Sequence, residues 1–221
     1  IRILKILDRF CHQYPRTLTS FHYDSSTSSF GNPILLLTKI IRKLYKLESL
    51  YINMKWDVRE KVYDDYLKNL FQAIMSLKFL KSCALALPKV LGDPQPLVQN
   101  VLGLKALEAL KLNLSSQELA LNDALKEIDN HHLKEIDLIL EGVREQSPNN
   151  LLARFFSSSS LETLRISFTA TLITDIDMVR ILTLLPNLPL LEGLSIRLNN
   201  ILTLTDRSIE TLAILMPTLW I

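Results

Sequence analysis

The sequence predicts an α/β solenoid in which parallel strands form one layer and helices form the other. Three observations predict it. A frame with apolar residues at its first, fourth and sixth positions recurs along the 221 residues. Within each frame apolar and other residues alternate, as they do in a strand with one buried face. The segments between frames carry apolar residues at helical spacing, so each unit contributes one strand and one helix.

The frame occurs seven times. Its first, fourth and sixth positions are Leu18-Phe21-Tyr23, Leu47-Leu50-Ile52, Leu80-Cys83-Leu85, Leu107-Leu110-Leu112, Leu133-Ile136-Leu138, Leu161-Leu164-Ile166 and Leu191-Leu194-Ile196. From the second frame on, the eighth position is also apolar: Met54, Leu87, Leu114, Leu140, Phe168 and Leu198. Leu219 would open an eighth frame, and with it the first positions of consecutive frames lie 26 to 33 residues apart. We therefore expect seven strands of similar length, one per frame.

Helix starts and stops fall between these strands. Pro15 ends an apolar helix over residues 1–13, and Pro33 begins another over 34–44. Asp57 with Glu60 resembles a capping box for a helix over about 58–76. Further helical segments are expected after Pro96, over 117–129, over 149–156, and after the pairs Thr174-Asp175 and Thr205-Asp206. The serine run 157–160 is interpreted as a loop before the sixth strand.

One strand and one helix cannot bury their own apolar faces, so consecutive units must stack against one another. We expect a horseshoe with parallel strands on the concave face and helices on the convex face. No composition shift marks a boundary, so residues 1–221 are interpreted as a single array of about seven repeats.

The segment Leu191 to Ile201 reads LEGLSIRLNNI and matches the pattern LxxLxLxxNxL of a leucine-rich repeat. Spacing near 28 residues with a full helix per unit resembles the ribonuclease-inhibitor-like class of these repeats, over residues 14 to 221. In that family the ninth position is usually Asn or Cys, but only Asn199 follows this rule here. The resemblance therefore implies a degenerate array whose strand-to-helix loops vary in path.

The terminal capping units of that family have no counterpart in the sequence. The chain also begins with Ile1 and ends at the start of a further frame. We therefore expect it to be part of a longer chain, with the array continuing beyond both ends or covered there by a partner.

Composition argues against several classes of partner. With 25 basic and 23 acidic residues the formal net charge is only +2, so we expect no nucleic-acid binding. No apolar run approaches the roughly 18 residues that span a bilayer, so we expect no membrane insertion. Cys11 and Cys83 are too few and too far apart for a disulfide framework. These features favour a cytoplasmic protein, with a cytoskeletal or ciliary assembly as an alternative because many long arrays of this type serve there.

Catalytic patterns are weak. The five glycines are isolated, so neither a phosphate-binding loop nor a dinucleotide fingerprint is present. His131 and His132 lie near acidic residues, but no HExxH or CxxC spacing accompanies them, and a loop is the better interpretation. Cys83 replaces a core leucine and is expected to be a buried thiol. We predict no catalytic residue, no metal and no cofactor.

The fifth and seventh positions of the frames should point to the concave face, which is where such solenoids bind partners. The candidate partner-binding residues are His22, Asp24, Tyr51, Asn53, Lys111, Asn113, Asp137, Arg165 and Arg197. Tyr51 is the strongest single anchor, because aromatic residues dominate interface energetics. Arg165 and Arg197 are suited to a local acidic patch. The alternative is that these side chains are merely solvated.

We therefore predict a non-enzymatic scaffold that docks a protein partner within a larger assembly. The alternative is the recognition arm of a multidomain protein, such as a ubiquitin-ligase substrate receptor or an innate-immune sensor, because both often carry such repeats.

Overall fold

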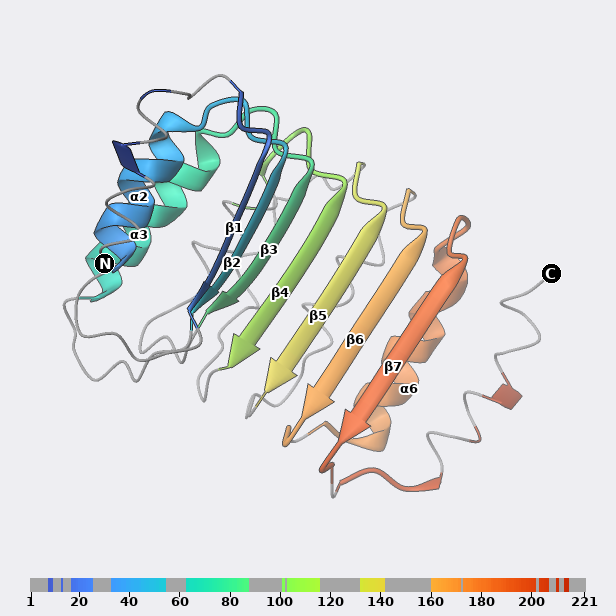
Figure 1. Ribbon diagram of the computed structural model, residues 1–221. Helices are drawn as coiled ribbons and strands as arrows, with labels where there is room; N and C mark the ends of the chain where they lie inside the picture. The colour runs from blue at the N-terminus through green and yellow to red at the C-terminus, as the bar shows by residue number, and fades with distance from the viewer. Residues whose placement is uncertain are drawn as a thin grey trace.

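The chain folds around one parallel sheet flanked by helices (Figure 1). The computed structural model describes residues 8–9, 13, 17–25, 33–54, 63–87, 101, 103–115, 132–141, 160–171, 173–201, 203–206, 210 and 213–214. Within these residues the seven strands are all parallel and lie in the order β1-β2-β3-β4-β5-β6-β7. The predicted α/β class with a parallel sheet is confirmed, and its topology is compatible with an α/β solenoid.

Each predicted frame forms one strand. The strands are β1 (Ser20–Ser25), β2 (Ser49–Met54), β3 (Ser82–Leu87), β4 (Ala109–Ser115), β5 (Glu135–Glu141), β6 (Thr163–Thr169) and β7 (Gly193–Asn199). Fourth positions lie opposite one another across the whole sheet: Phe21, Leu50, Cys83, Leu110, Ile136, Leu164 and Leu194. The apolar period of the sequence therefore sets the register, because a slip of one residue would turn every side chain to the other face.

The helices follow the expected signals where the structure describes them. Helix α2 (Pro33–Lys43) has proline in its first turn, and helix α3 (Tyr63–Met75) falls within the predicted 58–76. Helix α6 (Asp175–Leu184) begins directly after its N-cap Thr174, a residue of the predicted pair Thr174-Asp175, and a 3₁₀ turn, η1 (Leu185–Asn187), follows the helix. Most residues of the helices expected over 1–13, after Pro96, over 117–129 and over 149–156 lie outside the described residues, as do Asp57 and Glu60.

Helix α6 shows why a helix starts where it does. The Thr174 side chain accepts a hydrogen bond from the backbone N–H of Asp177, and the Asp177 carboxylate accepts one from the backbone N–H of Thr174 at 3.0 Å. This capping box satisfies two backbone donors that have no partner within the helix. Asp177 is buried by this arrangement although it is acidic.

The core lies between the sheet and the helices. The side chains of Leu50 and Ile52 on β2 are fully covered, as are Ile40 and Ile41 on α2. Leu70 and Ile74 on α3 are also fully covered, and they belong to the same cluster. Each side chain of this size contributes about 1.5–3 kcal/mol when it is fully buried. The shared cluster is what ties one strand-helix unit to the next.

Backbone hydrogen bonds join the units at the start of each strand. The Glu48 carbonyl accepts the N–H groups of Lys81 and Ser82, at 2.8 and 3.0 Å. The same double acceptance recurs at Thr19, Lys81, Glu108, Lys134 and Glu162. One geometry thus repeats from strand to strand, and it holds the side chains at equivalent positions in rows.

Strand β7 differs from the other six. Leu194 and Ile196 are only half-buried, and Leu198 is 42% exposed, whereas Phe168 at the same position of β6 is 1% exposed. Among the described residues β7 pairs with β6 alone, so its apolar positions are covered on one side only. The apolar positions of β7 are therefore more exposed than the equivalent positions of β6.

Candidate partner-binding face

The candidate residues lie together on the face of the sheet that is opposite the core. Fifth positions lie side by side in the order His22, Tyr51, Ala84, Lys111, Asp137, Arg165 and Ser195. Seventh positions follow as Asp24, Asn53, Ala86, Asn113, Ile139, Ser167 and Arg197. All of them are half-buried or exposed, while their neighbours along β2 to β6 are buried where the structure describes them. We call this surface the exposed face.

The exposed face carries no described helix. In Figure 1, α6 lies behind β6 and β7, so that the viewer looks onto the exposed face. Parallel sheets are usually covered on both faces, and their strands then read as continuous apolar runs. Here the strands alternate instead, as the burial pattern of β5 and of β6 shows.

The first two strands hold an aromatic pair. The rings of His22 and Tyr51 are stacked, with centroids 4.0 Å apart and planes 25° from parallel. Two positions further along, the Asn53 side-chain amide donates to both carboxylate oxygens of Asp24, each at 3.3 Å. Four of the predicted residues thus form two side-by-side pairs, in which neighbouring strands fix each other's side chains.

Strand β3 presents only small side chains. Ser82, Ala84 and Ala86 are half-buried on the exposed face, and we call them the small-residue strip. The larger Tyr51 and Lys111 lie in register with Ala84, one on each side. The side chains of the strip therefore project less far from the sheet than those of Tyr51 on β2 and Lys111 on β4.

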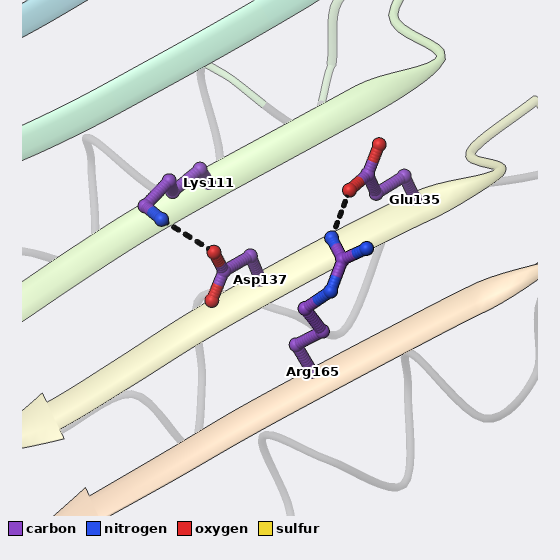
Figure 2. Close-up of polar contacts among 4 residues, drawn as sticks. All are labelled: Lys111, Glu135, Asp137 and Arg165. Carbon is purple, nitrogen blue, oxygen red and sulfur yellow. Dashed lines mark hydrogen bonds and ion pairs between the residues drawn. The ribbon is translucent and has the colours of Figure 1, made fainter. Parts of the chain in front are cut away.

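The centre of the exposed face is a block of four charges (Figure 2). Nζ of Lys111 lies 2.5 Å from Oδ2 of Asp137, its neighbour in register on β5. The guanidinium of Arg165 on β6 binds the Glu135 carboxylate on β5. Each ion pair joins one cation to one anion, so the block has no net charge. We call these four residues the charge block.

Glu135 is the member of the charge block that was missed among the predicted site residues. It occupies a third position, where most frames have a small residue, and it lies diagonally from Arg165, whose neighbour in register is Asp137. The signal was present in the sequence, because a cation and an anion two residues out of register on adjacent strands are within reach of long side chains.

Within the described part of the chain, the predicted residues Arg197 and Asn113 have neither a polar partner nor a ring contact. Arg197 is exposed on β7 opposite Ser167 and forms no ion pair with the described residues. Asn113 on β4 is half-buried, and its side-chain oxygen is covered without a hydrogen-bond partner. Arg197 is therefore the cation of this face that remains available to an anionic group.

A second row of charges runs along the starts of the strands. Nζ of Lys81 lies 2.9 Å from Oε2 of Glu48, and Nζ of Lys134 lies 3.5 Å from Oε2 of Glu108. The hydrogen bond and the charge of Glu48 raise the pKa of Lys81 above its usual value, and Glu108 adds to the effect. All four side chains are exposed, so these pairs contribute little to stability.

The described residues do not assemble a reactive group on the exposed face. Cys83 lies on the opposite, buried side of β3, where loss of water raises the pKa of its thiol to about 12. No three His, Cys, Asp or Glu residues of the described ranges are placed to hold a metal ion. Most of the acidic and histidine cluster around His131 lies outside those ranges. The arrangement thus offers shape and charge to a contacting molecule.

Within the same ranges no helix combines the length and the apolar character needed to cross a membrane. The chain matches no known family model and no curated protein.

Proposed function

We propose that this chain is a non-enzymatic protein-interaction scaffold that docks a protein partner on the exposed face. We further propose that the array is a leucine-rich repeat horseshoe of the ribonuclease-inhibitor-like class, in which the exposed face is concave. The observation that carries the first proposal is that no helix among the described residues covers one face of the seven-stranded parallel sheet. A sheet of this kind is ordinarily covered on both faces, so an open one is available to another molecule.

The side chains on the exposed face support a protein as that molecule. They combine a stacked aromatic pair, a small-residue strip and paired charges, and the charge block has no net charge. Protein interfaces characteristically mix aromatic anchors with polar and charged contacts. A nucleic acid would instead require a surface dominated by cations.

The rigidity of the exposed face supports the same proposal. Its side chains project from strands that are hydrogen-bonded in register from β1 to β7. Several of them are fixed by a neighbour before any partner arrives, as Tyr51 is by His22. Side chains that are already ordered lose less conformational freedom on binding, which favours affinity.

The test is to place a photo-crosslinking amino acid either on the exposed face at Ser167 or on the helical side at Arg180. Native cell extract is then irradiated with each form of the full chain. We expect one protein to be captured in stoichiometric amounts from position 167 and little from position 180. Absence of a stoichiometric partner, or equal capture from both positions, would overturn the proposal.

A further inference from the structure

We infer that the docked partner presents an extended segment with two features: an apolar side chain that lies on the small-residue strip, and a carboxylate that pairs with Arg197. This inference rests on the proposed function, because it specifies the partner of the same exposed face. It follows from three properties of that face. The side chains of the small-residue strip are short, Arg197 has no ion-pair partner among the described residues, and the distance between the strip and Arg197 is set by the strand spacing.

The small-residue strip is suited to an apolar side chain. One face of the Tyr51 ring is occupied by His22, and its neighbour on the other side is Ala84, which has only a methyl group. A partner side chain resting on Ala84 and Ala86 would contact that methyl surface and the Tyr51 ring at once. Aromatic side chains bury the largest apolar area in such a contact and gain from offset stacking, so Phe, Tyr or Trp is favoured.

Arg197 selects the charge of the second contact. The other two cations of the exposed face, Lys111 and Arg165, are already paired with Asp137 and Glu135. Arg197 forms no ion pair with the described residues, and it is exposed. Guanidinium groups bind carboxylates through two parallel hydrogen bonds, so a partner carboxylate is the complementary group.

Glu141 forms no ion pair with the described residues, and it does not oppose this contact. It lies at the end of β5, in register with Thr169 and Asn199, and thus two strands away from Arg197 and two residues further along. Spacings of about 4.8 Å between strands and about 3.3 Å between residues place it roughly 12 Å away. That is beyond the screening length of about 8 Å at physiological salt.

The distance between the two contacts limits the partner sequence. Four strand spacings separate β3 from β7, or about 19 Å across the exposed face. An extended segment advances about 3.3 Å per residue, so about six residues would cover this distance. The reach of the Arg197 side chain shortens it. The segment therefore carries its aromatic and acidic residues about four to six positions apart, and it crosses the charge block between them.

The probe is a phage-displayed library of random twelve-residue peptides, selected against the full chain. We expect selected peptides to carry an aromatic and an acidic residue about four to six positions apart. The chain variant Ala84→Trp fills the small-residue strip and Arg197→Glu reverses the charge, so each should weaken a selected peptide at least tenfold. Tyr51→Ala tests the strip without adding bulk. Arg180→Glu, which makes the same charge change on the helical side, should leave binding unchanged.

A double-mutant cycle identifies the carboxylate contact. Changing the acidic residue of the peptide to its amide should weaken binding to the natural chain and have no further effect on an Arg197→Ala variant, which removes the guanidinium without adding a charge. Circular dichroism and thermal unfolding of each variant establish that loss of binding is not loss of fold. The inference is overturned if selected peptides lack the paired residues, or if Ala84→Trp, Tyr51→Ala and Arg197→Glu all bind them as the natural chain does.

Ile139→Arg separates failure of this inference from failure of the proposed function. Ile139 lies in the middle of the exposed face, away from both contacts. If Ile139→Arg abolishes binding while the strip and Arg197 variants do not, peptides dock on the exposed face by other contacts, and only this inference fails. If none of these variants affects binding, the exposed face is not the docking surface and both proposals fail.

Discussion

Lys111 and Asp137 occupy the fifth positions of β4 and β5 and lie directly opposite each other, with Nζ of Lys111 2.5 Å from Oδ2 of Asp137. Glu135, on the same strand as Asp137, is bound by Arg165 on β6. Strand β5 therefore supplies both carboxylates of the charge block, and its neighbours on either side supply one cation each. Without these cations, the two carboxylates of β5 would repel each other.

Reversing one charge of the block should be costly, and reversing both members of a pair should restore most of the loss. Lys111→Glu places a third carboxylate beside Asp137 and Glu135, and we expect it to lower the free energy of unfolding by about 1 kcal/mol. The double variant Lys111→Glu with Asp137→Lys should recover at least half of that. Urea unfolding at low and high salt measures both values, and the difference should shrink as salt is added. Equal stability of the single and double variants would contradict the pairing.

The fourth positions of β6 and β7 are both leucine but differ in burial, which predicts that the two leucines differ in their contribution to stability. Leu164 on β6 is fully buried and Leu194 on β7 is half-buried. Leu164→Ala leaves a cavity with neighbours on both sides, and we expect a loss of about 3 kcal/mol. Leu194→Ala removes fewer contacts and should cost about 1 kcal/mol. Chemical denaturation of the two variants makes the comparison, and equal losses would mean that β7 is covered in solution.

The fold was largely predictable from the sequence because burial here has a strict period. Each strand repeats the same apolar positions, so aligning Leu50, Leu110 and Leu164 as equivalents also gives the register of the sheet. The starts of α2 and α6 were predictable as well, because Pro33 and Thr174 act through local backbone chemistry.

The exposure of β7 was not predictable, because burial of Leu198 depends on whether a neighbour exists on its far side. The apolar positions of the β7 frame, Leu194, Ile196 and Leu198, are residues of the same kind as those at the buried positions of β6.

The site was predictable as a face but not as a set of pairs. Position in the frame places Tyr51, Asp137 and Arg165 on the exposed face, since side chains alternate along a strand. It does not say that Arg165 binds Glu135, which is diagonal to it, in place of Asp137, which is opposite. That choice depends on Asp137 already being bound by Lys111. Partner choice among exposed charges is thus a property of three strands together.

Loss of the cap at Thr174 should weaken α6 locally. Thr174→Ala removes the oxygen that accepts from the Asp177 backbone N–H, so we expect the free energy of unfolding to fall by about 1 kcal/mol. Thr183→Ala is the matched control, because the Thr183 hydroxyl is exposed and donates only to the Arg180 carbonyl within the helix. That substitution should be neutral within about 0.5 kcal/mol. Urea unfolding measures both, and an unaffected Thr174→Ala variant would show that the cap does not support the helix.

The burial of Cys83 predicts how stability and thiol reactivity depend on pH. Its pKa is raised from 9.0 to about 12 in the folded chain, so between these values the unfolded state loses the proton that the folded state keeps. Because of this thiol, the free energy of unfolding should fall as the pH rises above 9. Below pH 9 the thiol is protonated in both states, so it should cause no change there. A Cys83→Val variant keeps an apolar side chain of similar size and should lose this contribution. The measurement is thermal unfolding from pH 7 to pH 11 for both forms, with Cys11→Ser in both backgrounds to remove the second thiol.

Alkylation by iodoacetamide at pH 8 should be slow in the folded Cys11→Ser chain and fast in urea, because the buried thiol reacts only on opening. Rapid alkylation without urea would place Cys83 at the surface and contradict the packing of β3.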